Sequence, residues 1–230
     1  NFSTLIATFL SHYKSNELKI DDVRKKYLLI KGDNNQKRAL IFISLFKKIY
    51  DKYHQRLKDE NSIDYDDMII EGRKKVGNEW YKYILVDEFQ DISQARSKLL
   101  QKIQMENEAK VYCVGDDWQA IYQFAGGDIS IFTKDFKKEY GIFERVDIDS
   151  TFRFGKKINL LSSNFIQKNP NQLKKKIYSS NKSHDGLVVV YHYNRFNEVA
   201  KKIMEMEKRS KTYILGRYNL NYYDAQLKKN

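Results

Sequence analysis

The stretch ILVDEFQD, residues 84–91, runs from three aliphatic residues straight into a cluster of carboxylates. A short apolar run bounded by polar residues predicts a buried strand, and a strand that is apolar on both faces is typical of a parallel sheet covered by helices. Ligands of open parallel sheets bind at the carboxyl ends of the strands. The stretch therefore predicts an α/β fold in which Asp87, Glu88 and Asp91 stand at the functional edge of a sheet.

The sequence that follows repeats this pattern. Residues 111–114 form a second apolar run, which ends at Gly115-Asp116-Asp117, and Ser93 is placed to cap a helix between the two runs. Short apolar runs that alternate with helices predict a parallel sheet with helices on both faces. Further elements expected here are a helix that carries Ile129, Phe132 and Phe136 and a third strand at residues 145–148.

The regions on either side have patterns of their own. About the first 75 residues are expected to be helical, because apolar residues recur there at helical spacing on both sides of a turn signal at residues 31–34. After Arg153 the alternating pattern starts again, which predicts the beginning of a second α/β unit. Its expected elements are a helix from about Lys156 to near Pro170, a strand at residues 187–191, a helix that carries Val199, Ile203 and Met206, and a strand at residues 213–215.

The composition favours a polyanionic partner. Lys and Arg outnumber Asp and Glu by 42 to 30 in 230 residues, a formal net charge of +12, and nucleic acid is the commonest such partner. A basic surface that serves solubility alone is the alternative. Cys113 is the only cysteine, which excludes an intrachain disulfide and a cysteine-rich zinc site and fits a reducing, cytoplasmic compartment. No apolar run has the length of a membrane span, so no membrane partner is expected.

The acids at the two strand ends suit phosphoryl chemistry. Carboxylate oxygens are hard ligands for Mg²⁺, which bridges to substrate phosphates, and a second carboxylate beside them can take a proton from an attacking water. Phosphoryl transfer needs this division of labour together with a cation that steadies the transition state. For a single such run, the simpler alternative is that the acids only cap the strand and solvate a loop.

Longer patterns match a known family. Residues 83–91 resemble the Walker B motif of UvrD/Rep-type superfamily 1 helicases, and residues 114–127 resemble their motif III. Residues 151–154 are similar to the family's motif IV with its arginine, residues 214–219 to a DNA-contacting strand end, and residues 63–69 to the segment that returns from an inserted helical subdomain. The motifs stand in the family's order. The resemblance implies partial RecA-like P-loop motor lobes, each a parallel sheet with flanking helices, plus a helical inserted subdomain.

Several details resemble the helicase IV branch of that family. Trp118 follows Gly-Asp-Asp, and Phe124-Ala125-Gly126 stands where most relatives have Trp-Arg-Gly. The segment of residues 169–175 is similar to that branch as well. Because Ala125 occupies the position of an arginine, whatever that arginine does in relatives is not carried over to this chain.

The resemblance assigns roles at a nucleotide site. It implies that Asp87 binds the Mg²⁺ of MgATP and that Glu88 polarises the hydrolytic water. It also implies that Gln119 senses the γ-phosphate and that Arg153, from the second lobe, stabilises the charge that develops there. ATP and Mg²⁺ are therefore the expected cofactors.

The resemblance also implies contacts with single-stranded DNA. Tyr122 and Phe124 would stack on bases, and Arg217 and Asn219 would contact the strand. Outside these motifs an aromatic pair is more often part of a core, and a lone arginine after a strand is more often a surface charge. The assignments therefore depend on the positions of these residues within the motifs.

The family's phosphate-binding loop is missing from this sequence. There is no G-x-x-x-x-G-K-[ST] pattern, and the one Gly-Lys pair, Gly155-Lys156, is followed by Lys157. The chain is therefore expected to be an internal fragment of a helicase and to be inactive alone. The expected domains are residues 1–78, the helical inserted subdomain; residues 79–150, the second half of the first RecA-like lobe; and residues 151–230, the start of the second.

The function expected of the full-length protein is that of an ATP-dependent DNA helicase or translocase on single-stranded DNA. Its 3′-to-5′ polarity, a role in DNA repair and association with a bacterial nucleoid are implied by the family alone. A nucleic-acid-binding module without motor activity is the alternative, and a phosphate loop encoded upstream would decide against it. A metal-dependent nuclease is a weaker alternative, because nothing here supplies the extra acids and lysine of such a site.

Overall fold

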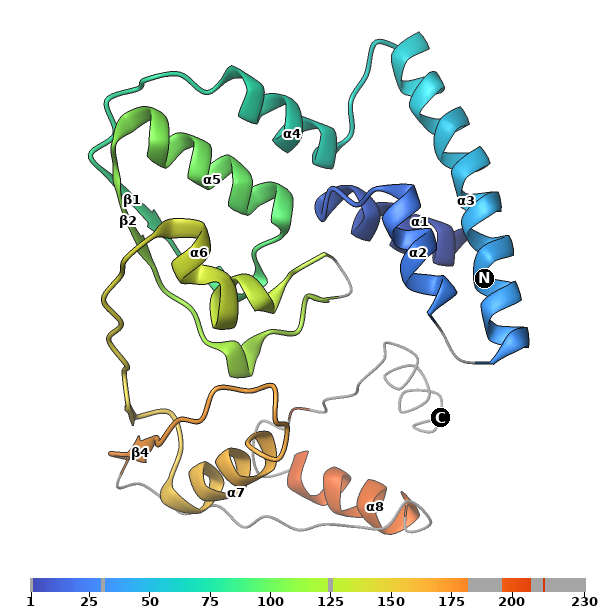
Figure 1. Ribbon diagram of the computed structural model, residues 1–230. Coiled ribbons are helices and arrows are strands. Elements are labelled where there is room, and N and C mark those ends of the chain that lie inside the picture. Colours follow the sequence, from blue (N-terminus) through green and yellow to red (C-terminus); the bar gives the residue numbers. More distant parts are fainter. Residues whose placement is uncertain (1, 30–31, 124–125, 182–195, 208–212, 214–230) are drawn as a thin grey trace. The chain divides into compact units, whose positions relative to one another are not determined.

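The computed structural model describes residues 2–29, 32–123, 126–181, 196–207 and 213. The chain forms two compact units (Figure 1). The first unit contains Asn1–Ser150 and Leu161–Tyr178, and the second contains Thr151–Leu160 and Ser179–Asn230. Both of the acidic segments singled out above lie in the first unit.

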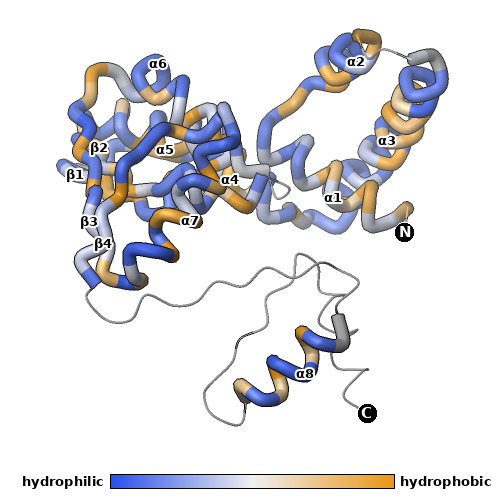
Figure 2. Tube along the Cα trace, turned by 90° about the horizontal axis from the view of Figure 1, so that it is seen from below, coloured by the Kyte–Doolittle hydropathy of each residue, from blue (hydrophilic) through white to orange (hydrophobic). Residues whose placement is uncertain are grey.

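The first unit begins with helices, as the sequence predicts: α1 (Phe2–Ser15), α2 (Ile20–Leu28), α3 (Asp33–Asp59) and α4 (Tyr65–Lys75). Apolar positions recur along α1 and α3 (Figure 2), and aromatic rings of these two helices interlock. Phe9 meets Phe46 edge-on with the ring centroids 4.6 Å apart, and Tyr13 meets the same ring at 5.3 Å. Because Phe46 is only 1% exposed, this aromatic contact is the centre of the helical part.

Two parallel strands follow the helices. β1 (Tyr83–Val86) pairs with β2 (Lys110–Cys113). Parallel strands need a crossover, which α5 (Gln94–Asn107) provides. The hydroxyl of Ser93 accepts the Arg96 amide, so the predicted helix cap is confirmed. Both strands form where the sequence predicts them, the second shifted by one residue.

One face of the strand pair packs on a hydrophobic core. Phe89, Ile92 and Leu100 are buried there together with Ile131. Ile131 opens a π-helical turn that leads into α6 (Phe136–Tyr140), so the helix predicted in this region is confirmed. The strand residues that pack against this core are Ile84 and Val86 of β1 and Val111 and Cys113 of β2.

The opposite face of the sheet is exposed, so the prediction that helices cover both faces is wrong for the described part of the chain. Leu85 is 76% exposed and Tyr112 is 65% exposed. The third strand predicted at residues 145–148 is also wrong, because residues 141–149 are exposed and form no strand. Backbone groups of a strand need a partner, and within the described residues this segment pairs with neither β1 nor β2. The apolar pattern of residues 145–148 is compatible with a strand, but a strand also needs a neighbouring strand to pair with.

The later elements are short. α7 (Lys156–Ile166) and α8 (Phe196–Glu207) form where helices are predicted. β3 (Ser150–Thr151) pairs with β4 (Tyr178–Ser179). The fold is thus mixed α/β, mostly helical, with small sheets.

Some predictions about the second half are left open. The predicted strand at residues 187–191 lies outside the described residues, and of residues 213–215 only Tyr213 is described, outside any strand. The RecA-like identity of the lobes and the boundaries of the three domains stay predictions. In the described ranges, no helix combines the length and the apolar character that a membrane crossing requires.

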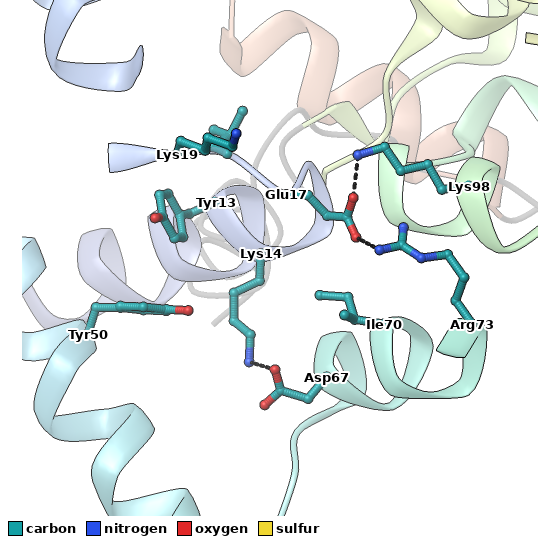
Figure 3. A pocket seen from close by; sticks show the side chains of 10 residues that line it. Tyr13, Lys14, Glu17, Lys19, Tyr50, Asp67, Ile70, Arg73 and Lys98 are labelled. Atoms are coloured by element: carbon teal, nitrogen blue, oxygen red, sulfur yellow. Dashed lines mark hydrogen bonds and ion pairs between the residues drawn. The ribbon is translucent and has the colours of Figure 1, made fainter. Parts of the chain in front are cut away.

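Ion pairs join α1 to the helices beside it. They lie around a cavity of about 360 Å³ (Figure 3). Lys14 of α1, with a side chain 3% exposed, pairs with Asp67 of α4 at 2.7 Å. Glu17 pairs with Arg73 of α4 at 2.7 Å and also with Lys98 of α5. None of the site residues predicted from the sequence lines this cavity, so we interpret these charges as braces between helices.

The carboxylate of Asp64, which caps α4, accepts hydrogen bonds from three donors, and Lys14 is one of them. It accepts the Lys14 ammonium at 2.5 Å, the Tyr53 hydroxyl at 2.8 Å and the Asp67 amide at 2.9 Å. Burial by itself raises the pKa of Asp64, but these donors outweigh burial and the pKa is lowered. The pKa of Tyr53 is raised to about 12, mainly by burial and secondly by the hydrogen bond to Asp64. A carboxylate with a lowered pKa stabilises the fold above its unfolded pKa, and that stability is lost as the pH falls through the folded pKa.

The buried lysine gives a stability prediction. Lys14→Met should lower the free energy of unfolding of this chain at neutral pH by about 3–5 kcal/mol, because the carboxylates of Asp64 and Asp67 lose their buried cation. Urea denaturation monitored by circular dichroism measures the change. Lys25→Met is the matched control, since the pair of Lys25 with Asp22 is exposed and contributes about 0–1 kcal/mol.

The same comparison has a pH dependence. The difference between wild type and Lys14→Met should shrink as the pH falls below the ordinary value of 3.8 and Asp64 becomes protonated in the folded state. Equal stability of the two proteins at neutral pH would contradict the assignment of Lys14 as a brace.

Candidate active site

The ends of β1 and β2 bring the two acidic segments side by side. The backbone ladder continues past both strands: the Val114 amide donates to the Val86 carbonyl at 2.8 Å, and the Phe89 amide donates to the Val114 carbonyl at 2.9 Å. These bonds hold the chain on both sides of Asp87 and Glu88. The acidic sheet edge expected from residues 84–91 therefore forms, with the end of β2 directly beside it.

Glu88 adopts a backbone conformation that is rare for a non-glycine residue. Its φ of 50° and ψ of 41° lie in the left-handed region. Its amide donates to Oδ1 of Asp87 at 2.9 Å, which fixes the two acids relative to each other. Both carboxylates are exposed to solvent. Strained residues of this kind gather at functional sites, where the surrounding structure holds them in place.

Gln90 connects Glu88 to the neighbouring strand. Its side chain is 2% exposed, its Nε2 donates to Oε2 of Glu88 at 2.6 Å, and its Oε1 accepts the Asp116 amide at 2.9 Å. One buried amide thus joins the end of β1 to the end of β2. Sequence reasoning missed this role of Gln90, whose only signal was an uncharged polar residue between acids and beside the buried Phe89.

Asp116 is the centre of a second set of bonds. Its Oδ2 accepts Nε2 of Gln119 at 2.9 Å, and its Oδ1 accepts Nζ of Lys175 at 2.5 Å. Burial by itself raises the pKa of Asp116, but the hydrogen bonds from Lys175 and Gln119 outweigh burial and the pKa is lowered. Lys175 is the second residue that sequence reasoning missed, because the resemblance of residues 169–175 to the helicase IV branch and the basic residues 174–176 gave it no role.

The other predicted site residues are less closely joined to this edge. Tyr122 is half exposed. Burial, together with the nearby charge of Glu88, raises the pKa of Asp91. Arg153 is exposed and belongs to the second unit. Outside the described residues lie Phe124, Ala125, Arg217 and Asn219.

The Asp87 carboxylate fits the requirements of a Mg²⁺ ligand. It presents a hard oxygen at an exposed position directly after a strand, and its partner Glu88 is held by Gln90. Mg²⁺ keeps several waters and is usually bound by one or two protein carboxylates together with substrate phosphates. This edge of the sheet can therefore bind a metal-bound phosphate ester and orient a base beside it.

The packing of Gln90 depends on Gly115. A Cβ atom on residue 115 would lie 2.7 Å from Oε1 of Gln90 and 3.2 Å from the ring of Phe132. Gly115→Ala should therefore displace the Gln90 amide and lower the free energy of unfolding by about 1–3 kcal/mol, as overpacked cores do. Gly77→Ala is the control, because a Cβ there meets nothing within 4 Å. Thermal melting of both variants checks this, and equal melting temperatures would contradict the packing argument.

Comparison with known proteins gives a consistent result. The family model described as the UvrD/REP helicase N-terminal domain matches residues 1–141. DNA helicase IV of Escherichia coli (strain K12) is 35% identical over 184 residues, which are 77% of this chain and 27% of that protein. The ATP-dependent DNA helicase PcrA of Bacillus subtilis (strain 168) is 29% identical over 177 residues, which are 71% of this chain and 23% of that protein.

A relative from another bacterial group agrees. The probable DNA helicase II homolog of Mycoplasma capricolum subsp. capricolum is 29% identical over 198 residues, 80% of this chain and 27% of that protein. The chain thus spans about a quarter of the length of these curated relatives. The matched region contains both strand ends and the bonds between them. The chain belongs to the UvrD/REP helicase family, as the motifs at residues 83–91 and 114–127 indicate.

Proposed function

We propose that these 230 residues form part of a longer ATP-dependent DNA helicase. The matched relatives are named as DNA helicases, and the chain spans 27% of one of them. The observation that carries the proposal is the bond of Gln90 to both Glu88 and the Asp116 amide. It supports the idea that the Walker B-like and motif III-like segments act as one nucleotide site.

At that site each residue has a proposed role. Asp87 holds Mg²⁺, which supplies neutralising charge for the β- and γ-phosphates when it is bound. Glu88 accepts a proton from the attacking water, and the bond from Gln90 orients its carboxylate. Gln119 senses the γ-phosphate, and Arg153 steadies the charge that develops on it.

DNA is the proposed polymer substrate, in single-stranded form. Tyr122 and Phe124 stack on bases, a mode of binding that tolerates any sequence. Arg217 and Asn219 contact the strand, and the net charge of +12 favours a polyanion. We further propose 3′-to-5′ movement, a role in DNA repair and a cytoplasmic place at the nucleoid, on the strength of family membership alone.

The proposed organisation follows the motifs. Residues 1–78 form the inserted helical subdomain, residues 79–150 the second half of the first RecA-like lobe, and residues 151–230 the start of the second. Without the G-x-x-x-x-G-K-[ST] pattern nothing in this chain cradles the β- and γ-phosphates. The chain alone is therefore proposed to be inactive as an ATPase, and the activity belongs to the full-length protein.

Substitution of the proposed base tests the function. In the full-length protein, Glu88→Gln should abolish ATP hydrolysis stimulated by single-stranded DNA, because an amide keeps the shape of the carboxylate and cannot accept the proton. Binding of MgATP should be retained. Steady-state ATPase assays and nucleotide titration measure the two quantities. Glu79→Gln is the control, since Glu79 is an exposed acid before β1 and should leave turnover unchanged.

Two results would contradict the proposal in different ways. Turnover by Glu88→Gln at the wild-type rate would remove Glu88 from the site. A full-length wild-type protein that binds DNA and never hydrolyses ATP would favour a nucleic-acid-binding module without motor activity.

A further inference from the structure

The segment of residues 172–175 binds the start of the motif III-like loop. Leu173 makes two bonds through its backbone: its amide donates to Oδ2 of Asp117 at 2.7 Å, and its carbonyl accepts Nε1 of Trp118 at 3.0 Å. Both partners are more than fifty residues earlier in the chain. The contact is therefore a tertiary connection between two parts of the first unit that local sequence does not bring together.

Lys175 adds ion pairs to this contact. Its Nζ lies 2.5 Å from Oδ1 of Asp116 and 2.5 Å from Oδ1 of Asp117, and it sits 5.2 Å from the centre of the Trp118 ring. Asp117 is fully buried, and the Lys175 ammonium meets its Oδ1 as an ion pair without hydrogen-bond geometry. A buried carboxylate needs such a counter-charge, because desolvation is otherwise uncompensated.

Gln172 completes the contact. In the amide orientation that satisfies its neighbours, its nitrogen donates to the carbonyl of Asp117 at 3.1 Å and to Oδ2 of Asp117 at 2.7 Å. These contacts from the segment thus all fall on Asp116, Asp117 or Trp118. The two sequence features that resemble the helicase IV branch, Trp118 and residues 169–175, are two sides of one contact.

Asp116 connects this contact to Gln119, the proposed γ-phosphate sensor. Asp116 binds Lys175 through Oδ1 and Gln119 through Oδ2. Both bonds therefore form only in one orientation of the Asp116 carboxylate. The Trp118 amide also donates to Oδ1 of Asp116, at 3.1 Å. Loss of the ammonium therefore removes the charged donor and leaves a weaker hold on the carboxylate that fixes the Gln119 amide. If the orientation of the Gln119 amide is not fixed, the amide contributes less to catalysis, because positioning of reacting groups supplies much of the rate enhancement in phosphoryl transfer.

We propose that Lys175 is a positioning residue that orients the Gln119 amide through Asp116, and that the segment of residues 172–175 is a brace for the nucleotide site. The proposal rests on the proposed function, because Gln119 acts only if the full-length protein hydrolyses ATP. In this role Lys175 acts through Asp116, to which its ammonium is bound. Its loss should therefore lower kcat and leave KM for ATP unchanged.

The first arm of the test measures the brace in this chain, without any activity. The chain has two tryptophans, so Trp80→Phe leaves Trp118 as the sole fluorophore. In that background Lys175→Met should raise the acrylamide quenching of Trp118, because the ring loses its ammonium neighbour and its bond to Leu173. Lys174→Met, at the exposed neighbouring position, is the control and should leave quenching unchanged. Unchanged quenching in folded Lys175→Met would overturn the proposal.

The second arm measures ATP turnover of the full-length protein stimulated by single-stranded DNA. Lys175→Met should lower kcat about tenfold, the size expected when a charge-assisted hydrogen bond that positions a reacting group is lost. Lys175→Arg should restore most of the rate, since it returns the charge. Lys175→Gln keeps a donor beside Asp117, protects the fold, and should still lower kcat.

The outcomes separate this proposal from the proposed function. A wild-type kcat in Lys175→Met, with increased quenching of Trp118, would overturn the positioning role and leave the helicase proposal intact. Unfolding of both Lys175→Met and Lys175→Gln would show that Lys175 serves stability alone, which also overturns the role. A full-length wild-type protein without ATPase activity would overturn the proposed function, and the positioning role would fall with it, even if the quenching arm succeeded.

Discussion

The close approach of Gln90 to Gly115 is the constraint on which the site depends. A buried amide must satisfy both its donor and its acceptor, and Gln90 does so with Glu88 on its own segment and with the Asp116 amide on the next. A shift of either strand end leaves one of these groups unpaired, at a cost of about 1–3 kcal/mol. The bond to Glu88 orients its carboxylate, and the bond to the Asp116 amide ties that carboxylate to the end of the neighbouring strand. One side chain therefore connects the two acidic segments.

Much of the fold could be predicted because it depends on local patterns. The apolar run at residues 83–86 becomes β1, the aromatic repeat along α1 and α3 becomes their contact, and Ser93 caps α5. The acids Asp87 and Glu88 directly follow β1, and backbone bonds place them beside the end of β2. The strand, the repeats along each helix and the helix cap are each encoded within a short stretch of sequence.

The rest could not be predicted because it depends on partners distant in sequence. Lys175 meets Asp116 across 59 residues, and nothing in a basic run indicates which carboxylate it will meet. From the sequence alone Gln90 resembles an exposed amide, because its partner at Asp116 is 26 residues away in the chain. The error at residues 145–148 has the same origin, since an apolar pattern shows that a segment can pair and does not supply the strand beside it.

Gln90 and Gln119 belong to one connected site, joined through Asp116. A double-mutant cycle on kcat for ATP hydrolysis by the full-length protein, with Gln90→Met and Gln119→Met, measures this connection. If the two side chains act through one network, the losses are strongly non-additive, and the double variant is little slower than the slower single variant. Losses in kcat that multiply would contradict the account, because they would show that the ends of β1 and β2 act independently.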